Sequence, residues 1–192
     1  MSLHMVLLPV FVLVGLTFFL LLWTGRARGN APAREARSDI VFVDQLDVLF
    51  YALIAIALPL RRTDLVIVML ATNDLKGRFG VGARDIAAGA GLLLDVVHAS
   101  MCGPGESPPE ALLLCPPPVG RLGLFAEEFA GAVERSRDLA RHYAAVADAR
   151  SCPWIDAGAP IRSSDTDGIH LDAQNHEQLG VVVAQQVRLL LA

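Results

Sequence analysis

The sequence predicts an α/β protein with a parallel sheet and helices on both of its faces. Three short apolar runs lack polar alternation, which is typical of strands that are buried on both faces. Segments with apolar residues at helical spacing come after these runs. The order strand, helix, strand, helix, strand, loop, helix is a βαβ series, and such a series connects parallel strands.

The elements of this series are expected, in chain order, at residues 64–70, 86–97, 111–115, 126–149, 153–157 and 173–191. The first, third and fifth are the strands. Apolar residues line the inner faces of the three helices: Ile86, Ala90, Leu93 and Val97; Phe125, Phe129, Val133, Ala140 and Tyr143; Leu179, Val183, Val187 and Leu190. Ahead of the series, residues 38–45 contain a short strand, Ile-Val-Phe-Val, and residues 46–60 are expected to form a core helix.

Composition and charge exclude several classes of protein. The chain has 192 residues, enough for one domain with a sizeable core. Its net charge of −4 leaves no basic surface for nucleic acid. Cys102, Cys115 and Cys152 are odd in number and far apart, so buried free thiols are expected. No set of His, Asp and Glu residues has the spacing of metal ligands, so no metal site is expected.

The N-terminal region resembles a membrane segment. Residues 5–23 are almost wholly apolar and nearly long enough to span a bilayer core of ~30 Å. Trp23 suits the membrane interface, and four arginines follow it within residues 26–37. By the positive-inside rule, these arginines keep the following soluble domain in the cytoplasm. The expected organisation is a hydrophobic membrane-type helix at 1–24, outside the domain, a linker at 25–45, and one domain at 46–192.

Two alternatives stay open for this region. A cleaved signal peptide is one, although Ala31-Pro32-Ala33 is a poor cleavage site and no charged residue precedes the apolar run. An alternative gene start or an upstream frame error is the other, because residues 25–38 are rich in Arg, Ala, Gly and Pro and have no periodicity.

Two polar loops that follow predicted strands carry the candidate site. Asn73 comes after the first strand of the series, and Asp167 and His170 come after the last. Sites in parallel sheets gather at the carboxyl ends of strands, so the loops are expected to share one site. An Asp three residues before a His can hold the imidazole while the far ring nitrogen takes a proton. An Asn amide suits a developing oxyanion.

Plainer roles fit the same residues. An Asp-x-x-His pair also occurs in surface turns, where the Asp caps the next helix, and Asn73 also fits an ordinary Asx turn. Asp172 directly precedes the last helix and is better placed as its cap, which leaves Asp167 for another role. The other histidines, for which surface or packing roles are expected, are His98, His142 and His176.

These motifs resemble those of the SGNH/GDSL hydrolases, and most closely their bacterial arylesterase and acyltransferase branch. The resemblance rests on residues 64–76, 114–118, 167–171 and 180–190, and covers about residues 46–192. It implies a flavodoxin-like three-layer α/β/α sandwich and the hydrolysis of small carboxylic esters through a seryl acyl-enzyme, without metal or cofactor. Related members also transfer the acyl group to alcohols or peroxide.

The resemblance also implies roles for individual residues. Asn73 matches the family's oxyanion Asn, and Asp167 and His170 match its catalytic Asp and His. Two departures stand out. Ala71 replaces the Gly of the Gly-x-Asn-Asp block, which adds one methyl group beside the site. The opening strand with Gly-Asp-Ser-Leu, which supplies the nucleophile, and the block with the oxyanion Gly are not recognisable.

No serine of this chain stands clearly in the place of the missing nucleophile. The serines considered are Ser2, Ser38, Ser100, Ser107, Ser136, Ser163 and Ser164, and none has the expected strand-to-helix elbow. The nucleophile is therefore unassigned. The interpretation favoured by the sequence is an SGNH-type serine esterase. The alternatives are a catalytically inactive or truncated membrane-tethered relative, and a membrane adaptor that is not an enzyme.

Overall fold

In a computed structural model of the chain, the structure describes residues 40–43 and 63–192. The chain divides into two compact units, Met1–Arg37 and Ser38–Ala192, and the described residues belong to the second. The predicted hydrophobic helix at 1–24 and the predicted core helix at 46–60 lie outside the described residues. Within the described part, no helix is both long and apolar enough to cross a membrane.

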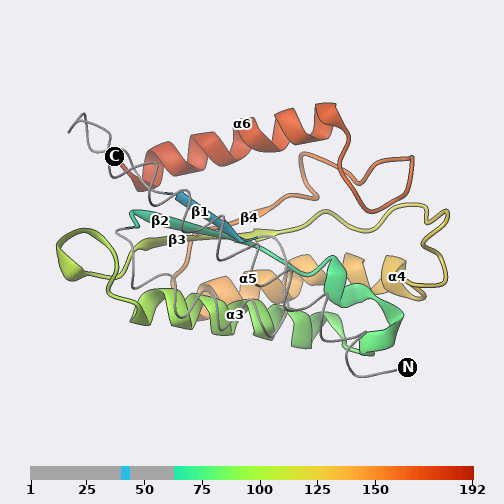
Figure 1. Ribbon diagram of the computed structural model, residues 1–192, viewed down its shortest axis with the longest axis horizontal. Coiled ribbons are helices and arrows are strands. Elements are labelled where there is room, and N and C mark those ends of the chain that lie inside the picture. Colours follow the sequence, from blue (N-terminus) through green and yellow to red (C-terminus); the bar gives the residue numbers. More distant parts are fainter. Residues whose placement is uncertain (1–39, 44–62) are drawn as a thin grey trace, which may run out of the picture. The chain divides into compact units, whose positions relative to one another are not determined.

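A four-stranded parallel sheet forms the centre of the domain (Figure 1). Its strands are β1 (Ile40–Val43), β2 (Leu65–Met69), β3 (Glu110–Cys115) and β4 (Trp154–Asp156), in the order β1-β2-β3-β4. All three pairings are parallel, so the strands end at the same edge of the sheet. The predicted parallel sheet and each of its predicted strands are confirmed.

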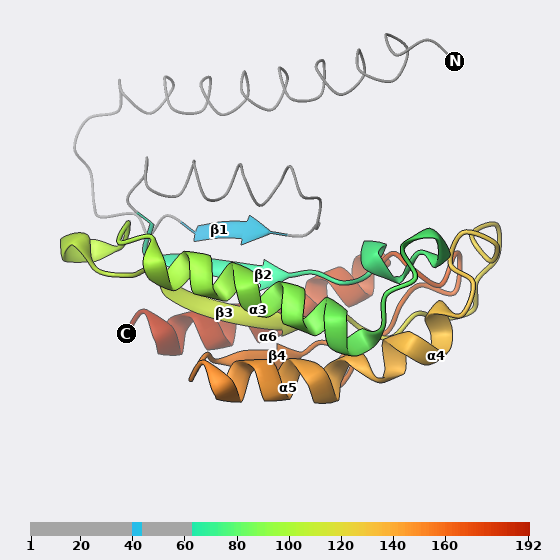
Figure 2. The ribbon, with the colours of Figure 1, turned by 90° about the horizontal axis from the view of Figure 1, so that it is seen from below.

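Helices cover both faces of this sheet, as the sequence predicts. Helices α3 (Ala83–Ala99) and α5 (Leu139–Ala149) lie side by side on one face, and α6 (Ala173–Leu190) lies on the other (Figures 1 and 2). Alternate residues of β2 supply the two cores: Val66 packs on the side of α3 and α5, and Leu65 packs on the side of α6. The domain is a three-layer α/β/α sandwich because β2 and β3 have apolar side chains on both faces.

The prediction of one long helix at residues 126–149 is wrong. Turns occupy residues 124–131, and two shorter helices follow, α4 (Ala132–Arg137) and α5. Gly131 has φ +71°, a left-handed conformation that separates the turns from α4. Near the end of α4, the Ser136 hydroxyl donates to the carbonyl of Val133 and accepts the amide of Val119. These bonds compete with the helical pattern, and α4 ends at Arg137.

Shorter elements complete the edge at which the strands end. Two 3₁₀ turns, η2 (Asn73–Leu75) and η3 (Gly77–Phe79), follow β2. A third, η4 (Pro104–Glu106), precedes β3 at the opposite edge. The three cysteines are free and buried, as predicted. Burial raises the pKa of Cys152 to about 11, so this thiol stays protonated and unreactive at neutral pH.

Candidate active site

Asp167 and His170 form a hydrogen-bonded pair in the loop between β4 and α6. Asp167 Oδ2 lies 2.6 Å from Nδ1 of His170. The second carboxylate oxygen accepts the backbone amides of Ile169 at 2.8 Å and His170 at 2.9 Å. Three hydrogen bonds lower the pKa of Asp167 to about 2. The bond from the Ile169 amide has the largest effect, and those from the imidazole and the amide of His170 come next. Asp167 is therefore ionised at neutral pH and holds the imidazole with Nδ1 protonated.

The far nitrogen of the His170 ring remains available for chemistry. The His170 side chain is 72% exposed, whereas that of Asp167 is 22% exposed. Within residues 63–192, no group hydrogen-bonds Nε2. With Nδ1 protonated, Nε2 carries the lone pair. The pair can therefore act as a general base that accepts a proton at Nε2.

A closely packed turn fixes the shape of this loop. The amide of Gly168 donates to Ser164 O at 2.8 Å, and the amide of Ser164 donates to His170 O at 2.7 Å. Gly120 donates its amide to Gly168 O at 2.7 Å, which ties the loop to the segment after β3. Gly168 has φ +74°, and a Cβ there would lie 2.6 Å from Arg121 O. Only glycine fits, so its place between Asp167 and His170 has a structural reason.

Asn73 begins η2, directly beyond the carboxyl end of β2. The buried hydroxyl of Tyr143 donates to Leu70 O at 2.7 Å and holds the end of the strand. Ala71 O then accepts the amides of Asp74 at 3.0 Å and Leu75 at 3.2 Å. Asn73 is half-buried, and its side-chain amide has no hydrogen-bond partner in the described part of the chain. Among the described residues, none competes with a ligand for this amide.

Ala71 occupies a backbone conformation that suits glycine. Its φ is +124°, far from the values that a residue with a Cβ prefers. The replacement of the expected Gly by Ala71 therefore adds backbone strain as well as one methyl group. The residue is only 2% exposed, so the surrounding core holds it in place.

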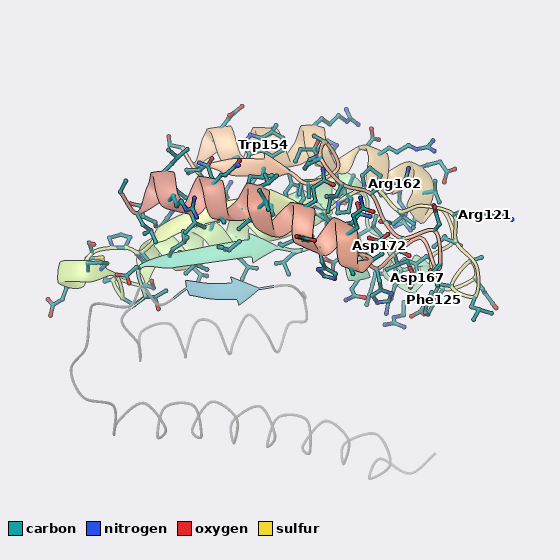
Figure 3. The ribbon with its side chains drawn as sticks, turned by 90° about the horizontal axis from the view of Figure 1, so that it is seen from above. Arg121, Phe125, Trp154, Arg162, Asp167 and Asp172 are labelled. Atoms are coloured by element: carbon teal, nitrogen blue, oxygen red, sulfur yellow. The ribbon has the colours of Figure 1, made fainter. Side chains whose placement is uncertain are left out.

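A run of aromatic and charged contacts connects the two loops. The rings of Phe125 and His170 meet edge to face with centroids 6.4 Å apart, and Phe125 meets Phe129 at the same separation. Lys76 Nζ lies 5.5 Å from the centre of the Phe129 ring. Figure 3 shows Phe125 and Asp167 at the same end of the domain. Segment 125–129 therefore spans from the His170 loop to the Asn73 loop, at the edge where the strands end.

Comparison with solved structures identifies the family. An aryl esterase of M. smegmatis is 36% identical to this chain, with a TM-score of 0.69 over 73% of this chain and 67% of that one. The chain belongs to the SGNH/GDSL hydrolase family. A carbohydrate acetylesterase from Sinorhizobium meliloti is 34% identical, with a TM-score of 0.69 and the same coverage. No protein-family model matches the sequence, and no curated protein matches it either.

A more distant SGNH/GDSL structure supports the fold alone. A GDSL-like lipase from Bacteroides thetaiotaomicron is 12% identical, with a TM-score of 0.61 over 88% of this chain and 96% of that one. The flavodoxin-like sandwich expected from the resemblance is confirmed by these structures together.

The serines of the described part lie apart from His170 Nε2 or have other partners. Ser163 donates its hydroxyl to Pro118 O at 2.9 Å, and the Ser164 hydroxyl accepts the amide of Thr166 at 3.1 Å. Ser136 belongs to α4. Ser100, Ser107 and Ser151 follow α3, η4 and α5, away from the ends of the strands. Ser2 and Ser38 lie outside the described residues. Among the residues that the structure describes, no serine hydroxyl hydrogen-bonds the His170 ring.

The sequence did not indicate the structural roles of Phe125, Gly168 and Arg135. Phe125 was expected to be a core residue, but it also contacts the His170 ring. Gly168 was part of the Asp-to-His motif, and only its positive φ shows why it is needed. The cation of Arg135 bonds backbone carbonyls, a role without a sequence signal. No group of three or more His, Cys, Asp or Glu residues suits a metal ion between residues 63 and 192.

Proposed function

We propose that this protein is an SGNH-type esterase that hydrolyses small carboxylic esters. The observation that carries the proposal is the 2.6 Å bond between Asp167 and His170, with Nε2 of His170 left open. His170 is the general base and acid, Asp167 orients its ring, and Asn73 is the oxyanion donor. Membership of a hydrolase family and the names of its relatives, an aryl esterase and a carbohydrate acetylesterase, support the same reaction class.

The reaction follows from the chemistry of these groups. Nε2 of His170 takes the proton of an attacking hydroxyl as that oxygen bonds to the ester carbonyl carbon. The carbonyl oxygen becomes an oxyanion, and the amide of Asn73 donates a hydrogen bond to it. The C–O bond to the alcohol then breaks, and His170 returns its proton to the leaving oxygen. Asp167 remains ionised throughout and stabilises the imidazolium.

The exposure of His170 gives an ester and a second acceptor access from solvent. A side chain that is 72% exposed is reached directly from solvent, so the ester does not have to enter a deep channel. If the attacking hydroxyl belongs to the protein, the acyl group is held covalently until water removes it. An alcohol in place of water would give acyl transfer by the same steps. We include this transfer in the proposal as a minor activity.

A catalytically inactive relative is the second candidate. It is favoured by one observation: no serine hydroxyl in residues 63–192 hydrogen-bonds His170. Such a protein would still bind an ester or acyl group at Asn73 and His170. Saturable binding of phenyl acetate without turnover, lost in Asn73→Ala, would support this candidate over the enzyme.

Membrane tethering through residues 5–23, with the soluble domain in the cytoplasm, is part of the proposal. It is supported by the apolar run and the arginines that follow it. Full-length protein is expected in a carbonate-washed membrane pellet, and its domain should be cleaved by protease only after the cells are opened. Recovery in the soluble fraction would contradict tethering.

Hydrolysis of p-nitrophenyl acetate tests the enzymatic proposal. His170→Ala is expected to lower kcat/KM roughly a thousandfold or more, because it removes the base. His176→Ala is the matched control, since His176 is an exposed histidine of α6 outside the pair. Equal rates for wild type and His170→Ala would contradict the proposal that the protein is an esterase.

A further inference from the structure

One arginine hydrogen-bonds both the Asn73 loop and the segment that contacts His170. Arg135, on α4, donates from Nη1 to Val81 O at 2.8 Å and from Nη2 to Leu75 O at 2.6 Å. Nη2 also donates to Ala130 O at 3.1 Å, and Nε donates to Gly131 O at 3.2 Å. A single guanidinium therefore serves four backbone carbonyls. Its side chain has no carboxylate partner in the described part of the chain.

The carbonyls that accept from Arg135 lie in two segments of the site. Leu75 ends the 3₁₀ turn that begins with Asn73, and Val81 lies just beyond the next turn. Ala130 and Gly131 end the segment in which Phe125 contacts the His170 ring. Arg135 therefore connects the loop of the oxyanion donor to the segment beside the general base.

Other contacts also join these segments. Glu128 forms ion pairs with Lys76 at 3.1 Å and Arg78 at 3.2 Å. The Arg78 side chain is 62% exposed, so its pair contributes little, whereas the Lys76 side chain is 19% exposed and its pair is a second link. Gly77 donates its amide to Glu128 O at 2.8 Å, which is one bond at the outer part of the loop. The fork of Arg135 instead satisfies several carbonyls at once, which the ammonium of a lysine does not reproduce.

We propose that Arg135 is a positioning residue that holds Asn73 at the distance and angle required by the oxyanion. This proposal rests on the proposed role of Asn73. Arg135 does not touch the substrate in this scheme. It acts through its hydrogen bond to the carbonyl of Leu75. This bond fixes the 3₁₀ turn that carries the Asn73 side chain.

Kinetics of Arg135→Ala and Arg135→Lys on p-nitrophenyl acetate provide the first arm of the test. Because the oxyanion bond strengthens in the transition state, kcat should fall about 10- to 100-fold while KM changes less than about twofold. Arg135→Lys should recover only a minor part of the rate. Arg137→Ala is the control, since Arg137 is an exposed arginine of the same helix.

A double variant identifies the route of the effect. If Arg135 acts through Asn73, Arg135→Ala should have no further effect on kcat in the Asn73→Ala background. Equal losses in both backgrounds would overturn the proposal, because Arg135 would then act by another route.

Amide hydrogen exchange gives a second arm that does not need activity. In Arg135→Ala, amides of residues 72–82 should exchange about tenfold faster or more, while those of α3 and α5 stay unchanged. Unchanged exchange at 72–82, or faster exchange throughout the domain, would overturn the proposal. If the wild type shows no hydrolysis, the esterase proposal fails, and this arm still decides whether Arg135 fixes the loop.

Discussion

Asp167 and His170 are bound to each other within one short turn, through a 2.6 Å bond between Oδ2 and Nδ1. The same carboxylate also accepts the backbone amide of His170 at 2.9 Å, so side chain and backbone of the histidine are held by one group. The orientation of the imidazole is therefore set locally. The orientation of the ring depends on the shape of this turn, and that shape requires Gly168.

Replacing Gly168 by alanine is expected to destabilise the domain. A Cβ at this position would lie 2.6 Å from Arg121 O, and φ is +74°. The free energy of unfolding should fall by about 1–3 kcal/mol or more, measured by chemical denaturation. Gly180→Ala is the control, because nothing lies within 4 Å of a Cβ there and Gly180 is inside α6. The control should gain up to about 1 kcal/mol, and equal effects would contradict the argument.

Replacing Ala71 by glycine is expected to relieve strain. Its φ of +124° costs about 1–3 kcal/mol for alanine but little for glycine. The lost methyl group and the extra chain entropy offset part of this gain, so the net change should be near zero or stabilising. Ala90→Gly in α3, equally buried, should instead lose about 1 kcal/mol or more. Similar losses in both variants would refute strain at Ala71.

Asp74 gives the domain a pH-dependent stability. Burial raises its pKa from 3.8 to about 6, and its Oδ2 has no hydrogen-bond partner in the described residues. The folded state therefore keeps this proton more tightly than the unfolded state does. Stability from this group is present below pH 4 and is lost as the pH rises from about 4 to 6.

The variant Asp74→Asn tests this dependence. At pH 7.5, on the order of 1–3 kcal/mol should be gained in the free energy of unfolding, since no charge is then buried. At pH values near 4 or below, the gain should vanish because wild-type Asp74 is protonated. A difference that stays constant across this range would contradict the assignment.

Much of the fold could be predicted because it depends on local patterns. The apolar run of β2 and the spacing of Ile86, Ala90 and Leu93 indicate burial directly. Residues 65–68 of β2 and these three helical residues are buried. The candidate pair was also predictable, because Asp167 and His170 lie in one turn. Asp172 caps α6 as expected, since its side chain accepts the amide of Asn175 at 2.8 Å.

What could not be predicted depends on distant contacts or on dihedral angles. The break between α4 and α5 involves Val119, which lies 17 residues from Ser136. The role of Arg135 requires carbonyls up to 60 residues away. The strain at Ala71 is visible only in its φ, because an alanine in the sequence does not indicate a positive φ.

The most direct test of the central claim compares Asp167→Asn, His170→Ala and the double variant in the hydrolysis of p-nitrophenyl acetate. Because the two side chains act as one unit, each single change should lower kcat by at least about a hundredfold. The double variant should be no slower than His170→Ala. Wild-type activity that survives His170→Ala, or losses that multiply in the double variant, would contradict a hydrolase that works through the Asp167–His170 pair.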